Sequence, residues 1–170
     1  MMHQLSLSLF NLPPEKSHMH KFLFFLFFIF TSSMAVSQTV YPYRDIKLEK
    51  PSDYKAMEPL ALSVATSLLS TPFVADDRNR MQSIEFLSNW ASGTKTCQFF
   101  MKGVVEDIST ESDLLSLYLA AMVKFTLENR VEAVNPLVVE KNACRMVLAY
   151  CDNPANNFKL KKKVRKLLEK

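Results

Sequence analysis

The chain contains very little glycine and histidine, and both shortages restrict its chemistry. Two of its 170 residues are glycine, at positions 93 and 103. A phosphate-binding loop, a dinucleotide-binding fingerprint or a turn-rich β-sandwich needs more glycine than this. The three histidines, His3, His18 and His20, all precede residue 21. Any histidine chemistry would therefore depend on the first segment of the chain remaining attached.

Residues 1–37 have the pattern of a cleavable signal peptide. Lys21 precedes an unbroken apolar run at 22–30, and the small residues Ala35 and Ser37 close the segment. The apolar run is too short for a membrane-spanning helix, which needs ~20 residues. We therefore expect export to the periplasm or the medium, with cleavage near Ser37-Gln38, and an uncleaved membrane anchor is the alternative. A start at Met19 would leave a more compact leader.

Removal of this leader would leave residues 38–170 with no histidine. Histidine is the commonest general acid–base group and transition-metal ligand near neutral pH. Its absence excludes a Ser-His-Asp triad, a Cys-His pair and a histidine-based zinc or iron site. The chain also has no D-x-D-x-D-G calcium loop. We expect no catalytic, cofactor-binding or metal-binding residues, and a hydrolase built on paired carboxylates is the remaining enzymatic alternative.

The spacing of apolar residues predicts a single all-α domain over 53–170, preceded by an extended arm at 38–52. About five helices are expected, beginning near residues 53, 77, 113, 136 and 158. Asp76-Asp77 and Asn135-Pro136 are typical helix starts, and residues 110–113 resemble a capping box. Pro59 either opens the first long helix or kinks a longer one.

Residues 114–127 are apolar on nearly every side of the predicted helix. Such a helix is either buried in a core or spans a membrane. The charged residues Asp113, Lys124 and Glu128 argue against a span, so we expect this helix at the centre of a bundle. Residues 94–105 lack a helical period and are expected to be extended.

Residues 159–170 include seven basic residues and one acidic residue. A basic amphipathic helix can bind a membrane surface or another polyanion. The candidate binding residues are Lys161, Lys162, Lys163, Arg165 and Lys166. The alternative is a helix that packs its leucines on an acidic body and leaves its lysines in water. Nucleic acid is not an expected partner, because the protein is exported and no aromatic residues alternate with the lysines.

Three cysteines are an odd number for an exported chain. Cys144 and Cys151 lie seven residues apart on one predicted helix, a rise of about 10.5 Å. That separation is beyond the reach of a disulfide. Any bridge within the chain would therefore join Cys97 to Cys144 or to Cys151. The alternative is that all three act as small buried apolar residues.

Three aromatic residues, Trp90, Phe99 and Phe100, are candidates for a binding surface. Aromatic residues at helical spacing are more often part of the core, which is the alternative. Loops on a rigid helical body commonly carry recognition, so the segment 94–105 is the favoured place for a binding edge.

Three stretches carry a resemblance to known proteins. TPFVADDRNRMQSIEFLSNWASGT at 71–94, LLSLYLAAMVKFTLEN at 114–129 and VLAYCDNPANN at 147–157 follow one another after a signal peptide. In this order they resemble small exported bacterial proteins of unknown function, over about residues 53–170. The resemblance implies export, one helical domain and no catalytic residues. Because the chain after the leader has no histidine, no metal motif and no phosphate loop, we expect a non-enzymatic exported protein that binds a protein partner, as an inhibitor, an immunity-like protein or an accessory protein of the cell envelope.

Overall fold

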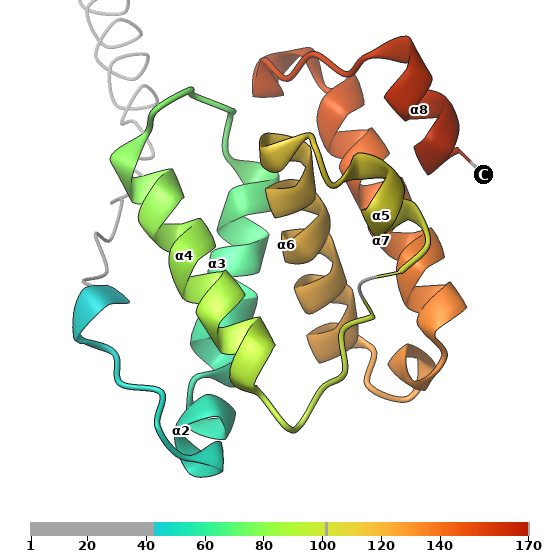
Figure 1. The fold of residues 1–170 in the computed structure, drawn as a ribbon. Helices are drawn as coiled ribbons and strands as arrows, with labels where there is room; N and C mark the ends of the chain where they lie inside the picture. The colour runs from blue at the N-terminus through green and yellow to red at the C-terminus, as the bar shows by residue number, and fades with distance from the viewer. Residues whose placement is uncertain (1–42, 101, 170) are drawn as a thin grey trace, which may run out of the picture. The chain divides into compact units, whose positions relative to one another are not determined.

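The computed structural model describes residues 43–100 and 102–169. Within these ranges the chain forms only helices and no β-strand, which confirms the all-α prediction (Figure 1). The α-helices are α2 (Pro51–Ala56), α3 (Glu58–Ser70), α4 (Arg78–Gly93), α5 (Val104–Ile108), α6 (Ser112–Glu128), α7 (Pro136–Asp152) and α8 (Lys162–Leu168). Three short 3-10 helices are η1 (Tyr43–Asp45), η2 (Glu132–Val134) and η3 (Pro154–Asn156). The predicted leader at 1–37 and its cleavage site at Ser37-Gln38 lie outside the described residues.

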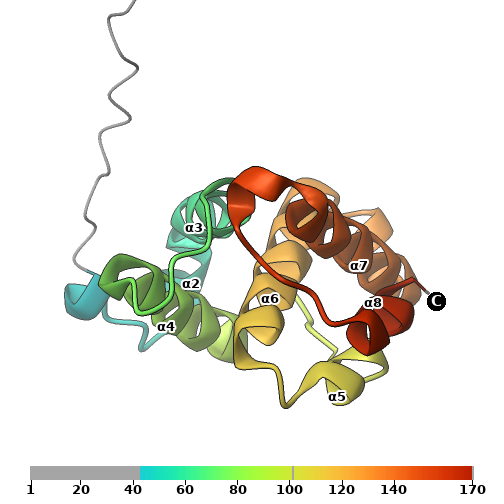
Figure 2. The ribbon, with the colours of Figure 1, turned by 90° about the horizontal axis from the view of Figure 1, so that it is seen from above.

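Helix α6 lies between the pair α3 and α4 and the group α5 and α7 (Figures 1 and 2). It contributes residues to two hydrophobic clusters. Ala120 and Val123 belong to the cluster formed with α3 and α4. Leu117, Tyr118 and several further α6 residues belong to the cluster formed with α5, α7 and α8. The sequence predicted that α6 is apolar on nearly every side. The structure shows why, since α6 is buried against other helices on both sides.

The described residues form seven α-helices where about five were expected, for two local reasons. Pro59 is the second residue of α3, and Met57 separates this helix from the short α2. The first of the two alternatives for Pro59 is therefore correct. The extended segment expected at 94–105 ends at Gly103, because α5 begins at Val104. All three apolar side chains of α5 are buried, so tertiary packing supports a helix that has no clear signal in the sequence.

Side-chain caps explain where two of the long helices begin. The Asp77 carboxylate accepts hydrogen bonds from the backbone N–H groups of Asn79 and Arg80, at 2.9 and 3.4 Å. The Asn135 side chain accepts one from the N–H of Leu137 at 3.0 Å. Both starts were predicted. The capping box expected at 110–113 does not form, because α6 begins at Ser112 without a side-chain cap.

The described part of the arm packs on α4 instead of extending away from the domain. The ring of Tyr43 stacks on that of Phe86, with centroids 5.1 Å apart and an interplanar angle of 19°. Ile46 and Leu48 are half-buried against the same cluster. The helical domain therefore begins before residue 53, and from residue 43 onward the expected extended arm is part of it.

The lack of a side chain at Gly93 allows α2 to pack closely on the end of α4. A Cβ at this position would lie 2.2 Å from the Tyr54 hydroxyl oxygen. Tyr54 is held from both ends: its hydroxyl donates to the Leu48 carbonyl at 3.0 Å, and its own carbonyl accepts from Trp90 Nε1 at 2.8 Å. Gly93 therefore provides space for the Tyr54 ring, and its backbone does not have the positive φ of a left-handed helix cap.

Gly93→Ala should destabilise the protein by about 1–3 kcal/mol, because the methyl group would displace the Tyr54 ring from its hydrogen bond to Leu48. Urea unfolding monitored by circular dichroism measures this change. Ser92→Ala, at the exposed neighbouring position, is the matched control and should change stability by less than about 0.5 kcal/mol. If the Gly93→Ala protein were as stable as the wild type, the position of the Tyr54 ring and its hydrogen bond to Leu48 would not contribute to stability.

Candidate functional site

Two of the three candidate aromatic residues belong to the core. Trp90 is fully buried, and its indole N–H donates to the carbonyl of Tyr54. Phe99 is half-buried, with its ring centroid 6.1 Å from that of Trp90. Phe100 is exposed. The structure thus leaves Phe100 as the aromatic candidate that a partner can reach.

All three cysteines carry free thiols. Cys97 packs against the cluster formed by α3 and α4, whereas Cys144 and Cys151 lie on α7 against the other cluster. The possible bridge from Cys97 to Cys144 or Cys151 is therefore not formed in this structure. Cys144 is buried and fits the alternative of a small apolar residue.

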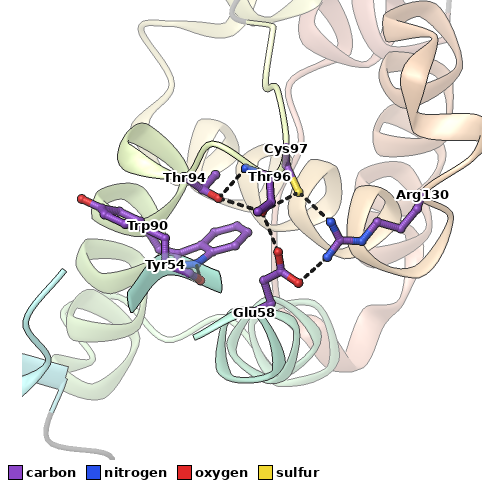
Figure 3. Close-up of polar contacts among 7 residues, drawn as sticks. All are labelled: Tyr54, Glu58, Trp90, Thr94, Thr96, Cys97 and Arg130. Carbon is purple, nitrogen blue, oxygen red and sulfur yellow. Dashed lines mark hydrogen bonds and ion pairs between the residues drawn. The ribbon is translucent and has the colours of Figure 1, made fainter. Parts of the chain in front are cut away.

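A polar network joins three distant segments around Cys97 (Figure 3). The guanidinium of Arg130 pairs with Glu58 Oε2 at 2.5 Å and donates from Nη1 to Cys97 Sγ at 3.5 Å. The hydroxyl of Thr96 donates to Glu58 Oε1 at 2.5 Å. These residues come from the start of α3, the segment after α4 and the segment after α6. No local pattern in the sequence links Glu58 to Arg130, which lie 72 residues apart.

A hollow of about 300 Å³ opens beside this network, and we call it the Cys97 hollow. It is lined by Lys95, Thr96, Cys97, Gln98, Phe100, Thr126, Arg130, Ala133 and Val134. The charged residues in this lining, Lys95 and Arg130, are both basic. Thr126 is buried, and its hydroxyl has no hydrogen-bond partner among the described residues. Burying an unsatisfied hydroxyl costs about 1–3 kcal/mol of stability.

Four large apolar side chains are exposed on the two segments that contribute Phe100 and Val134 to the lining of the Cys97 hollow, and together we call them the Phe100–Leu137 surface. Their exposed fractions are 45% for Phe100, 89% for Val131, 81% for Val134 and 72% for Leu137. Phe100 and Val134 both line the hollow, and Val131 and Leu137 lie three residues to either side of Val134. Single exposed apolar residues are ordinary, but a group of them is typical of an interaction site.

Ion pairs within the protein occupy two of the five basic candidates. The ammonium group of Lys161 lies 2.7 Å from Glu111, and Arg165 pairs with Asp152 at 2.5 Å. The hydrogen bond from Arg165 also lowers the pKa of Asp152. The other three candidates are exposed and have no acidic partner within the described part of the chain. They are Lys162, Lys163 and Lys166.

Helix α8 has no free apolar face. It is shorter than expected, beginning at Lys162, and its Val164 and Leu168 are buried in the cluster formed with α5 and α7. The apolar side of α8 therefore fits the alternative in which this helix packs on the rest of the domain. Within the described ranges, no helix has the length and apolar character needed to cross a membrane.

In the groove that Glu111 and Asp113 line, the carboxylates do not form a hydrolytic pair. A groove of about 620 Å³ between the segment after α3 and the segment before α8 is lined by two acidic residues, Glu111 and Asp113. Lys161 forms an ion pair with the Glu111 carboxylate, so Asp113 is the carboxylate of this groove that has no ion pair with another described residue. A glycosidase needs two carboxylates that act together. Across residues 43–100 and 102–169, no three His, Cys, Asp or Glu side chains lie close enough together to hold a metal ion.

Burial determines how the thiols ionise. It raises the pKa of Cys97, an effect that the Thr96 hydroxyl and the Arg130 guanidinium partly offset. It raises the pKa of Cys144 and of Cys151 to about 11. A thiol with a raised pKa carries little thiolate at neutral pH and is a poor nucleophile. Burial therefore disfavours the thiolate form of Cys97 at neutral pH.

These raised pKa values predict a loss of stability at high pH. An unfolded thiol ionises near 9.0, and folded Cys144 ionises near 11. Between these values the unfolded state holds fewer protons than the folded state, so the free energy of unfolding falls as the pH rises. Urea unfolding at pH 8, 9, 10 and 10.5 should show this decline. Cys144→Ala should reduce its slope, and a slope equal to that of the wild type would contradict the assignment.

Comparisons with known proteins identify no relative of the chain. No family model matches it, and neither a curated protein nor a solved structure gives a significant match. The case for a function therefore depends on the geometry of the Cys97 hollow, the Phe100–Leu137 surface and α8.

Proposed function

We propose that the chain is an exported, non-enzymatic protein that binds a second, different protein through the Phe100–Leu137 surface. The leader-like pattern of residues 1–37 supports export. The observation that carries the binding proposal is that two exposed apolar side chains from separate segments, Phe100 and Val134, line one hollow, with exposed Val131 and Leu137 three residues before and after Val134. The roles of inhibitor, immunity-like protein and envelope accessory protein all fit this activity.

The composition of the surface favours a protein as the partner. Protein interfaces combine apolar side chains, which exclude water, with polar groups that form hydrogen bonds at their edge. The Phe100–Leu137 surface supplies the apolar part, and the Cys97 hollow supplies the polar part. A symmetric pair of copies is disfavoured, because it would bring two sets of the basic residues Lys95 and Arg130 into one interface.

A photocrosslinker tests the proposal in the native cells. The photoreactive residue p-benzoylphenylalanine would replace Val134, and in a control protein it would replace Met81. Met81 is 61% exposed but lies on α4, and it does not line the Cys97 hollow. We expect the photoreactive residue at position 134 to give one protein adduct, which mass spectrometry identifies. The residue at position 81 should not give this adduct. A lipid adduct, an adduct with a second copy or the same adducts from both positions would overturn the proposal.

The affinity for the partner identified by crosslinking can then be measured with the purified partner. The double variant Val131→Asp, Val134→Asp should bind this partner at least about tenfold more weakly than the wild type, because two charges would replace apolar contacts. Both side chains are highly exposed, so the melting temperature should stay close to that of the wild type. Titration calorimetry measures the affinity, and Met81→Asp is the control that should bind normally. An unchanged affinity of the double variant would place the partner elsewhere on the molecule.

The exposed lysines of α8 favour a second candidate function, binding to an anionic membrane surface or another polyanion. Lys162, Lys163 and Lys166 are free to contact phosphate groups, whereas Lys161 is held by Glu111. Changing the three free lysines to glutamate should abolish cosedimentation with vesicles that contain phosphatidylglycerol. Vesicles of phosphatidylcholine alone are the control, and wild-type sedimentation of the triple variant would remove this candidate.

A further inference from the structure

We infer that the Cys97 hollow is a carboxylate-binding site and that the bound protein inserts a carboxylate into it while its apolar residues cover Phe100 and Val134. This inference rests on the proposed function and specifies the chemistry of the partner. The carboxylate belongs either to an aspartate or glutamate side chain or to the C-terminus of the partner.

The charge balance of the hollow favours an anionic ligand. Lys95 and Arg130 line it, and Glu58 neutralises one of these two charges through its ion pair with Arg130. Both oxygens of Glu58 already accept hydrogen bonds, one from Arg130 and one from Thr96. Lys95 has no acidic partner among the described residues, so one positive charge remains and a single carboxylate would balance it.

The hollow also holds more hydrogen-bond donors than acceptors. A guanidinium has five N–H donors, and Arg130 uses one on Glu58 and one on Cys97. The remaining donors of Arg130, together with the Lys95 ammonium and the exposed Gln98 amide, can reach an entering ligand. A carboxylate accepts hydrogen bonds at both oxygens and is the group that matches such a set.

Two further features define the ligand. Thr126 belongs to the lining, but its hydroxyl oxygen is closed to solvent, so the polar contacts of a ligand fall to Lys95, Gln98 and Arg130. Phe100, Ala133 and Val134 make the rest of the wall apolar. About 300 Å³ is at the lower end of the range for small-molecule sites, so the hollow fits a carboxylate beside one apolar side chain.

Glu58 is a positioning residue in this site. It lies in the first turn of α3 and holds the Arg130 guanidinium and the Thr96 hydroxyl in place. A guanidinium that is fixed before binding loses less conformational freedom when the ligand arrives. The ion pair thus prepares Arg130 for the carboxylate instead of competing with it.

Peptide probes test the inference on the purified protein without the partner. Acetyl-Val-Leu with a free carboxylate and the same peptide as its C-terminal amide differ only in the group that the hollow should recognise. Acetyl-Glu-Leu amide carries the carboxylate on a side chain instead. We expect at least one of the two acids to shift the nuclear magnetic resonance signals of residues 95–98 and Arg130, and the amide not to do so. The acid that binds more tightly identifies the source, and equal effects of acids and amide would overturn the inference.

A matched pair of lysine variants checks the site. Lys95→Gln should weaken binding of the acid at least tenfold, because it removes the charge that lacks an acidic partner. Lys102→Gln is the control, since Lys102 is exposed on the same segment but does not line the hollow. Equal affinities of the wild type and the Lys95→Gln protein would overturn the inference.

The two proposals can fail separately. If the crosslinked partner loses affinity for the Val131→Asp, Val134→Asp protein but binds the Lys95→Gln protein normally, the docking surface stands and the carboxylate site does not. If the acid binds in the hollow but position 134 yields no protein adduct, the carboxylate site stands and the docking surface does not.

Discussion

The burial of α6 is the constraint on which the rest of the structure depends. Its side chains belong to both hydrophobic clusters, with Ala120 and Val123 on one side and Leu117 and Tyr118 on the other. A helix that is apolar on nearly every side has to be covered on every side. The chain meets this requirement by packing α3 and α4 against one side of α6 and α5 and α7 against the other (Figure 2). The charged residues of α6 are accordingly few, and they are Asp113, Lys124 and Glu128, in its first turn and its last five residues.

The Cys97 network lies at the C-terminal end of α6 and has a simple electrostatic origin. Arg130 follows the end of α6, where the helix dipole favours a positive charge, and Glu58 begins α3, where the dipole favours a negative charge. Their ion pair therefore joins the ends of two helices that pack side by side. The segment from Thr94 to Gly103 crosses the same place and brings Cys97 and Phe100 to it. The hollow forms where these three segments meet.

The features that could be predicted from the sequence depend on residues that lie close together in the chain. The caps Asp77 and Asn135 act on N–H groups two or three residues away, so their patterns are visible in the chain. The pair of Glu58 with Arg130 is not visible, because packing alone brings these distant residues together. The side chains of α5 give no helical signal, since burial and not propensity supports that helix. The exposure of individual side chains could not be predicted from composition either. Trp90 is buried and Val134 is exposed, and composition favours neither outcome.

The basic segment and the Cys97 hollow lie at opposite ends of α6. Lys161 pairs with Glu111, which precedes α6, whereas Arg130 follows it. A 17-residue helix spans about 25 Å, so the Cys97 hollow and the basic segment are separate surfaces. The surface ion pairs of α8 contribute little stability, about 0–1 kcal/mol each, so its buried apolar residues do most of the anchoring. Its free lysines are consequently not required for the fold, and the two candidate surfaces can act independently in one molecule.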